Sequence, residues 1–171
     1  GGPLSQQRVL VTAGGTQEPI DPVRAITNRS SGKQGYALAQ AALDAGAEVT
    51  LIHTPTNLPT PAGAQEVLVH TAAEMKEAVL AAAVECEVIL MAAAVADFRP
   101  AQVAAQKIKK GGGGLTLELE PTEDILMALA KARKPGGLPR VVVGFAAESQ
   151  DLEKNAAIKL AAKKLEMIVA N

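Results

Sequence analysis

Short apolar runs alternate with helix-like segments along most of this chain. The first run, Arg8–Ala13, carries apolar residues on both of its alternating faces, which is typical of a strand covered by helices on each side. Further strands are predicted over Glu48–His53, Glu66–His70, Glu87–Ala92, Leu115–Leu119, Arg140–Gly144 and Met167–Ala170. Helices are predicted over Gly32–Ala45, over Ala72–Val84, from the N-cap Thr122 to about Arg133, and over Leu152–Lys164. The alternation predicts an α/β fold, a Rossmann-like three-layer sandwich with a mostly parallel central sheet.

Three segments fall outside this alternation. Residues 14–31 are rich in Gly, Thr, Pro, Asp and Ser and are predicted to form a loop. The segment Ala101–Gly114 is small and basic and ends in four glycines, so we expect a flexible flap rather than a packed element. Residues 1–7 carry little information and are interpreted as a linker or a remnant of cloning, followed by one domain over residues 8–171.

The composition favours one globular domain and excludes several function classes. The chain has 171 residues, of which 48% are hydrophobic and 20% charged. Its 17 basic and 18 acidic residues give none of the basic excess typical of proteins that bind nucleic acid or anionic membranes. The aromatic residues are Tyr36, Phe98 and Phe145, too few for a surface that stacks nucleobases. With no secretory signal and no membrane-length apolar run, the chain is predicted to be cytoplasmic.

Cysteine and histidine are scarce, so we predict no metal centre built from protein ligands. Cys86 is the single cysteine, which excludes an intramolecular disulfide and a thiolate-rich zinc site. It lies in an apolar run and is interpreted as an inert core thiol. His53 and His70 both end predicted strands, and neither is assigned a catalytic role.

The loop after the first strand is the first candidate binding element, because ligands of parallel sheets bind at the carboxyl ends of the strands. It lacks the G-x-G-x-x-G spacing of dinucleotide sites, and the second strand ends without an acidic residue for a ribose. Its glycines still allow close backbone approach, and the residues before the predicted helix lie where free N–H groups attract an anion. The predicted phosphate-binding residues are Gly14, Gly15, Thr16, Ser30, Ser31 and Gly32. The alternative is a turn-rich helix entry in which Asp21 and Arg24 pair.

Residues 14–32, which read G-G-T-Q-E-P-I-D-P-V-R-A-I-T-N-R-S-S-G, resemble the opening signature of the phosphopantothenate–cysteine ligase family. The resemblance continues through residues 92–100 (A-A-A-V-A-D-F-R-P) and 107–110 (K-I-K-K). It extends to residues 124–126 (D-I-L), 143–148 (V-G-F-A-A-E) and 168–171 (I-V-A-N). It covers essentially the whole chain from Arg8 to Asn171.

The resemblance implies a ligase that joins 4′-phosphopantothenate to L-cysteine in coenzyme A biosynthesis. The substrate carboxylate attacks the α-phosphate of CTP, accompanied by Mg²⁺, and cysteine then attacks the acyl-cytidylate. The family is dimeric, so a homodimer is expected. Family members continue past the final strand, so this chain is interpreted as truncated at its C-terminus. The bacterial bifunctional form carries a flavin-dependent phosphopantothenoylcysteine decarboxylase ahead of this domain, so no flavin is expected here. The choice between CTP and ATP stays open.

The resemblance also implies which residues act. It gives catalytic roles to Asn28 and Lys107. It implies CTP contacts for Met91, Ala92, Ala93, Asp97, Lys107, Glu123, Asp124, Ile125, Leu126, Phe145, Lys159 and Lys163.

Several of these assignments have a structural alternative. The lysines at 107, 109 and 110 suit a triphosphate, but a solvated charge run would look the same. Lys159 and Lys163 share a predicted helix face, where lysines are commonly just solvated. Asp97 could instead cap a turn or pair with Arg99, and Phe145 could belong to the core.

Two other functions are weighed against the ligase. A short-chain oxidoreductase would share the sheet, but it needs a Tyr-x-x-x-Lys pair, and Tyr36 is followed at that spacing by Gln40. A non-catalytic fragment that binds nucleotide and dimerises is the second alternative. Pyrophosphate release from CTP in the presence of phosphopantothenate separates the ligase from both.

Overall fold

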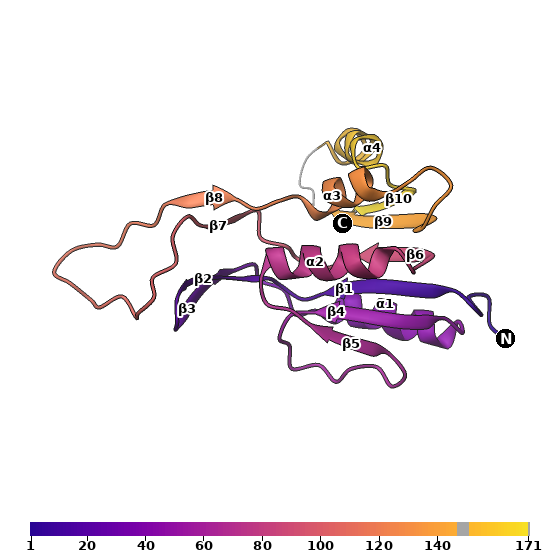
Figure 1. Ribbon diagram of the computed structural model, residues 1–171, viewed down its shortest axis with the longest axis horizontal. Coiled ribbons are helices and arrows are strands. Elements are labelled where there is room, and N and C mark those ends of the chain that lie inside the picture. The colour runs from indigo at the N-terminus through magenta and orange to yellow at the C-terminus, as the bar shows by residue number, and fades with distance from the viewer. Residues whose placement is uncertain (147–150, 171) are drawn as a thin grey trace.

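A six-stranded parallel sheet forms the centre of the computed structural model, which describes residues 1–146 and 151–170 (Figure 1). Its strand order is β10-β9-β6-β1-β4-β5. In chain order the elements are β1 (Arg8–Ala13), β2 (Gln17–Asp21), β3 (Arg24–Thr27), α1 (Lys33–Asp44), β4 (Glu48–His53), β5 (Gln65–Leu68), α2 (Ala72–Ala83), β6 (Val88–Met91), β7 (Phe98–Pro100), β8 (Leu119–Pro121), α3 (Ile125–Ala132), β9 (Val141–Ala146), α4 (Leu152–Ala162) and β10 (Met167–Ala170).

The three layers follow from the alternation of apolar side chains along β1. Val9 and Val11 pack with α1 in one core cluster, whereas Leu10 packs with α2 and α3 in the other. Figure 1 shows α1 on the opposite side of the sheet from α2 and α3. The predicted three-layer α/β sandwich with a mostly parallel sheet is therefore confirmed. No helix in the described residues is long and apolar enough to cross a membrane.

Several predicted elements need correction. Residues 17–27, predicted as loop, form the antiparallel hairpin β2–β3, in which Gln17 pairs with Thr27. The strand predicted over Leu115–Leu119 begins only at Leu119, where β8 pairs with the unpredicted strand β7. The last helix, predicted to reach Lys164, ends at Ala162.

The N-cap of α3 is Asp124 and not the predicted Thr122. The Asp124 carboxylate accepts a hydrogen bond from Met127 N at 3.0 Å. The Thr122 hydroxyl instead donates to the carbonyl oxygen of Ala96 at 2.5 Å, which draws it toward the loop after β6. Both residue types are good caps, so the tertiary hydrogen bond decides which of them serves.

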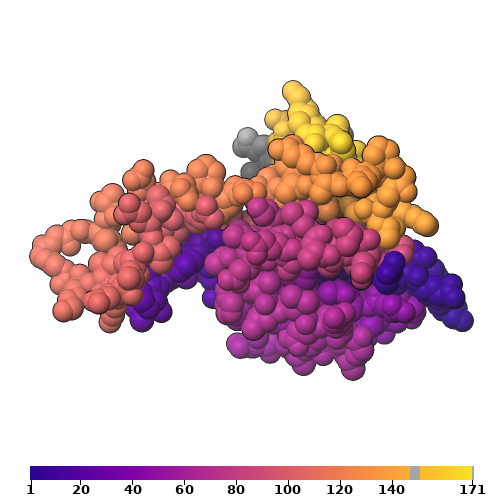
Figure 2. All heavy atoms as spheres, viewed as in Figure 1, coloured from indigo at the N-terminus to yellow at the C-terminus, as the bar shows by residue number. Residues whose placement is uncertain are grey.

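The hairpin β2–β3 and a long arm project together beyond the carboxyl edge of the sheet (Figures 1 and 2). We define the arm as residues 98–121, which comprise β7, β8 and the segment between them. The predicted flap Ala101–Gly114 contains no helix or strand, as expected. Its first half is nevertheless anchored, because Ala104 N donates to Ile20 O at 3.0 Å and Ile108 N donates to Asp21 Oδ2 at 3.1 Å.

An ion pair joins two strands at the opposite, amino edge of the sheet. Arg8 donates to Glu87 from its backbone N at 2.7 Å and from Nη2 at 3.0 Å. These hydrogen bonds, first from the Arg8 side chain and then from its backbone, lower the pKa of Glu87 to about 2. The adjacent Cys86 is buried, as predicted, and its burial raises the pKa of the thiol.

The Arg8–Glu87 pair predicts an acid-dependent contribution to stability. An unfolded glutamate titrates near 4.5 and the folded Glu87 near 2, so the contribution is present above about pH 4.5 and is lost as the pH falls toward 2. We expect Glu87→Gln to lower the Tm at pH 7, with the difference from the parent shrinking as the pH falls through this window. Thermal unfolding of both proteins between pH 7 and pH 3 measures this. A Tm difference independent of pH would contradict the assignment.

Candidate functional site

The loop after β1 lies directly against the loop after β6 at the carboxyl edge of the sheet. Gly15 and Ala94 form an isolated parallel bridge beyond the two strands. Ala94 N donates to Gly14 O at 2.7 Å, and Thr16 N donates to Ala94 O at 3.1 Å. The structure therefore places the predicted Gly14–Thr16 loop beside the predicted nucleotide segment, a contact that the sequence alone does not reveal.

Buried hydroxyl groups fix the backbone of the loop after β6. The Thr12 hydroxyl accepts from Ala93 N at 3.1 Å and the Thr16 hydroxyl accepts from Ala96 N at 2.9 Å. Both threonines are completely buried. Residues 92–94 are all alanine, so a planar ligand could lie close to the backbone of this fixed segment. Thr12 was not identified from the sequence. The signal that could have found it is a polar residue inside an otherwise apolar strand.

The N-terminus of α1 lies against the Gly14–Thr16 loop after β1. Its N-cap is Gly32, with φ of 75° and no side-chain cap, and a Cβ there would lie 3.6 Å from Gly14 Cα. Ser30 Oγ accepts from Gly32 N at 3.3 Å, and Ser31 Oγ accepts from Lys33 N at 3.4 Å. The predicted phosphate-binding residues are thus assembled in one place, where helix N–H groups and the helix dipole favour an anion.

A glycine that sequence analysis did not single out sets the distance between α1 and β1. A Cβ on Gly35 would lie 2.4 Å from Ala13 Cβ and 2.8 Å from Thr12 O, so only glycine permits this helix–strand contact. The available signal was a glycine inside a predicted helix, which costs helix stability unless packing requires it.

Asn28 lies at the base of the hairpin, just beyond β3. Its Nδ2 donates to Val95 O at 3.3 Å, and its side chain is exposed. A Cβ on Gly15 would lie 2.7 Å from Asn28 O. Asn28 is therefore in contact with both loops of the site.

Lys107 is placed elsewhere. Its neighbour Ile108 is hydrogen-bonded to Asp21 and Arg24 at the turn of the hairpin, whereas Gly15 and Asn28 lie at the hairpin base. At about 3.3 Å per residue, β2 separates its two ends by roughly 13 Å. Within one chain, the structure does not bring Lys107 to the glycine loop.

The acidic residues before α3 already have partners. Asp124 pairs with Lys163 at 2.9 Å, and Glu123 pairs with Lys76 at 2.6 Å. Burial alone would raise the pKa of Asp124, but the hydrogen bonds from Lys163 and Met127 N outweigh it and lower that pKa. The hydrogen bond from Lys76 lowers the pKa of Glu123.

The other predicted nucleotide residues divide between surface and core. Asp97 is exposed, and Arg99 pairs with Glu120 and not with Asp97. Ile125 and Met91 are buried in the core, and Leu126 packs against the same cluster. The partly exposed positions are Ala92, Ala93, Phe145, Lys159 and Lys163. Ala147, Glu148 and Asn171, quoted for the family resemblance, lie outside the described residues.

His53 belongs to the interior, consistent with the absence of an assigned catalytic role. Its Nδ1 lies 2.8 Å from Thr54 O and 3.1 Å from the Tyr36 hydroxyl, and its Nε2 lies 2.6 Å from Glu66 Oε1. These contacts connect β4, α1 and β5 beneath the glycine loop. Residues 1–146 and 151–170 contain no group of three or more His, Cys, Asp or Glu side chains that could hold a metal ion.

Another polar residue missed from sequence is Glu18, on β2 just beyond the glycine loop. It is 2% exposed, and its two carboxylate oxygens accept from Ala72 N at 3.3 and 3.2 Å. Burial raises the pKa of Glu18, while the hydrogen bonds from Ala72 N and the Thr16 hydroxyl oppose that rise. Glu18 thereby fixes the base of the hairpin against the N-terminus of α2.

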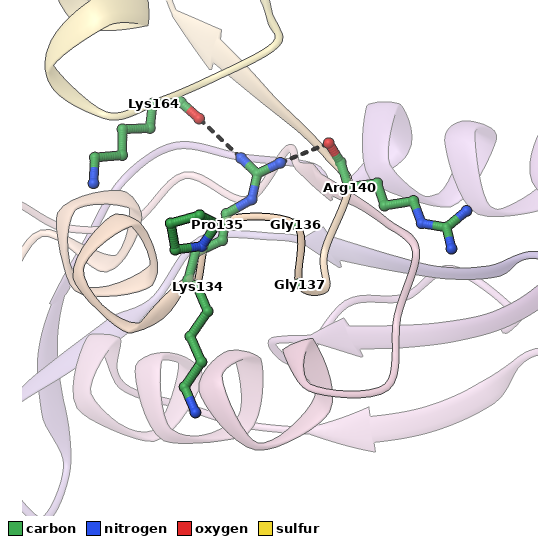
Figure 3. A pocket seen from close by; sticks show the side chains of 7 residues that line it. Lys134, Pro135, Gly136, Gly137, Arg140 and Lys164 are labelled. Carbon is green, nitrogen blue, oxygen red and sulfur yellow. Dashed lines mark hydrogen bonds between the residues drawn. The ribbon is translucent and has the colours of Figure 1, made fainter.

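A cavity of about 500 Å³ lies at the opposite, amino edge of the sheet (Figure 3). Its most buried cation, Arg133, already donates to the carbonyl oxygens of Pro139, Arg140 and Lys164 and pairs with Glu166. Figure 3 shows the side chains of Lys134, Arg140 and Lys164 pointing in different directions. Because these cations do not converge, the carboxyl-edge loops are the better candidate site.

The hydroxyl of Thr16 gives a direct test of this arrangement. We expect Thr16→Val to destabilise the fold by about 1–3 kcal/mol, because it leaves the buried Ala96 N–H without an acceptor. Thr16→Ser retains the hydroxyl and should lose much less. Urea unfolding of the three proteins measures the free energies. A larger loss in the Ser variant than in the Val variant would show that the methyl group, which valine keeps and serine lacks, supports the loop and that the hydrogen bond does not.

Comparison with known proteins identifies the family of the chain. The family described as "DNA/pantothenate metabolism flavoprotein C-terminal domain" matches residues 4–171. The chain is 51% identical over 170 residues to the coenzyme A biosynthesis bifunctional protein CoaBC of Bacillus subtilis, covering 99% of this chain and 41% of that protein. The chain therefore spans about two fifths of this curated relative.

Two solved structures are similar throughout the chain. The C-terminal domain of a coenzyme A biosynthesis bifunctional protein CoaBC superposes with a TM-score of 0.88 at 42% identity, covering 100% of this chain and 80% of that one. A Cab2 mutant in complex with phosphopantothenate-cysteine superposes with a TM-score of 0.79, covering 96% of this chain and 72% of that one. The identity to Cab2 is 19%, so this second likeness shows the fold alone.

Proposed function

Because the chain belongs to the family of DNA/pantothenate metabolism flavoprotein C-terminal domains, we propose that it is a phosphopantothenate–cysteine ligase domain of coenzyme A biosynthesis. It would join 4′-phosphopantothenate to L-cysteine through an acyl-cytidylate made from CTP. The observation that supports this most strongly is the contact of the Gly14–Thr16 loop with both the N-terminus of α1 and the loop after β6. The family match displaces the short-chain oxidoreductase alternative.

The first half-reaction needs an anion site beside a nucleoside site. We assign the triphosphate to the glycine loop and the α1 N-terminus, where the helix dipole favours an anion and where the Ser30 and Ser31 hydroxyls already accept from two backbone N–H groups. The nucleoside would lie along residues 92–97, whose backbone is held by the Thr12 and Thr16 hydroxyls. Mg²⁺ would enter with CTP as the counter-ion of its phosphates. In this scheme the protein contributes positioning and electrostatics, and the substrate carboxylate supplies the nucleophile.

A catalytic role for Lys107 adds a geometric requirement. The lysine lies at the tip of the hairpin, so either the arm must move over the site or a second copy must supply its arm. We propose a homodimer, as the family resemblance implies. Light scattering of the protein with and without CTP would measure the assembly state.

The relatives also bear on the rest of the pathway. CoaBC is described as bifunctional, and this chain corresponds to about two fifths of it. We propose that a flavin-dependent phosphopantothenoylcysteine decarboxylase domain accompanies this ligase and that the flavin belongs to that domain. The reaction would run in the cytoplasm, where its nucleotide and phosphorylated substrates are found.

Pyrophosphate release from CTP in the presence of 4′-phosphopantothenate tests both the function and the role of Lys107. If its ammonium stabilises charge at the α-phosphate, Lys107→Gln should slow release by about 10²–10³-fold, or about 3–4 kcal/mol of barrier. Lys134→Gln, an exposed lysine at the amino edge, is the matched control and should leave the rate unchanged. Release within threefold of the parent would show that Lys107 is a surface charge only.

Asn28 is proposed to serve the second half-reaction, in which cysteine attacks the acyl-cytidylate. Its amide can donate to an oxygen and accept from an amine, whereas aspartate cannot donate and adds a negative charge beside an anionic intermediate. We expect Asn28→Asp to spare much of the CTP-dependent activation but to let acyl-cytidylate accumulate even with cysteine present. Single-turnover quenching with mass detection measures the intermediate. Product formation at the parent rate would exclude a catalytic role.

A further inference from the structure

The carboxylate of Asp21 holds two segments that are far apart in sequence. Asp21 closes the turn between β2 and β3, and its side chain is completely buried. Its Oδ1 accepts from the turn amides Val23 N at 2.9 Å and Arg24 N at 2.8 Å. Its Oδ2 accepts from Ile108 N at 3.1 Å and pairs with Arg24 Nε at 3.2 Å.

Arg24 completes this contact from the other side of the same peptide segment. Its Nη2 donates to the carbonyl oxygen of Ile108 at 2.6 Å. The N–H and the C=O of Ile108 are therefore both bound by the hairpin, while Lys107 and Lys109 on either side remain exposed. By contrast, the glycines that follow at 111–114 have no atom within 4 Å of where a Cβ would lie.

We propose that Asp21 is a positioning residue that seats the segment Lys107–Lys109 on the hairpin and so fixes where its ammonium groups are presented. The effect on catalysis rests on the proposed function, whereas the seating itself does not. Because the hairpin binds the backbone N–H and C=O of Ile108, the ammonium groups of Lys107 and Lys109 take no part in the contact and stay available to a ligand. Burial alone would raise the pKa of Asp21, but the amides of Ile108, Val23 and Arg24 and the guanidinium outweigh it and lower that pKa. Asp21 is therefore an ionised acceptor at neutral pH.

Asp21→Asn separates the two roles of the carboxylate. The amide oxygen can still accept from Val23 N and Arg24 N, which preserves the turn. The amide nitrogen replaces Oδ2 and would meet two donors, Ile108 N–H and Arg24 Nε–H, so the seating contact is lost. A second variant, Ile108→Pro, removes the N–H of residue 108 and so the same hydrogen bond, without changing the Asp21 side chain itself.

Limited trypsin digestion of the native protein reads out the seating without any substrate. Cleavage after Lys109 and Lys110 should be at least ~10-fold faster in both variants than in the parent, because proteolysis follows the population of the released segment. Glu118→Gln, an exposed carboxylate on the same arm, is the control and should leave the rate unchanged. Cleavage within twofold of the parent in both variants would overturn the proposal.

Pyrophosphate release then tests whether the seating acts through Lys107. We expect Asp21→Asn to lower kcat about tenfold and to cause no further loss when it is combined with Lys107→Gln, since both changes remove the same positioned charge. Losses that multiply in the double variant would overturn a role through Lys107. If the parent itself releases no pyrophosphate, the proposed function fails, and the digestion result still decides the seating.

Discussion

The absence of side chains at three glycines around the end of β1, two just after the strand and Gly35 on α1, is the constraint on which the candidate site depends. A Cβ at Gly35 would meet Ala13, one at Gly14 would lie 2.1 Å from Thr54 Oγ1, and one at Gly15 would meet the carbonyl of Asn28. Each glycine admits a different neighbour: helix α1, the segment after β4, or the end of the hairpin. Because all three neighbours approach one strand, the site is built mainly from backbone, and its shape is fixed by packing rather than by long side chains.

Most of the sheet could be predicted closely because its strands are short and those in its middle are apolar and largely buried. The bounds of β1, β4 and β10 agree with the sequence prediction, since each is a β-branched run flanked by polar or small residues. The hairpin β2–β3 was missed for the opposite reason: it lies outside the main sheet, contains Pro19, and has a largely exposed second strand, β3. Its pairing depends on the Asp21 turn, which an alternation pattern does not reveal.

The site was predictable only in part. The rule that ligands meet the carboxyl ends of parallel strands pointed to the loops after β1 and β6, which the structure places side by side. The hydroxyls of Thr12 and Thr16 could not be assigned, because their acceptor roles exist only once residues some 80 positions away lie beside them. Lys107 likewise lies at the tip of the hairpin because its neighbour Ile108 is hydrogen-bonded to the hairpin turn. The sequence motif does not reveal this long-range contact.

The four glycines at 111–114 have an evolutionary consequence. They have no neighbours that an added side chain would strike, and they follow the point where Ile108 is held. The entropy of closing a flexible loop rises only slowly with its length, so extra residues here would cost little. The lineage can therefore lengthen or shorten the arm at this point while the lysines before it keep their place. Length variation should concentrate there, and the same point suits the insertion of a peptide tag.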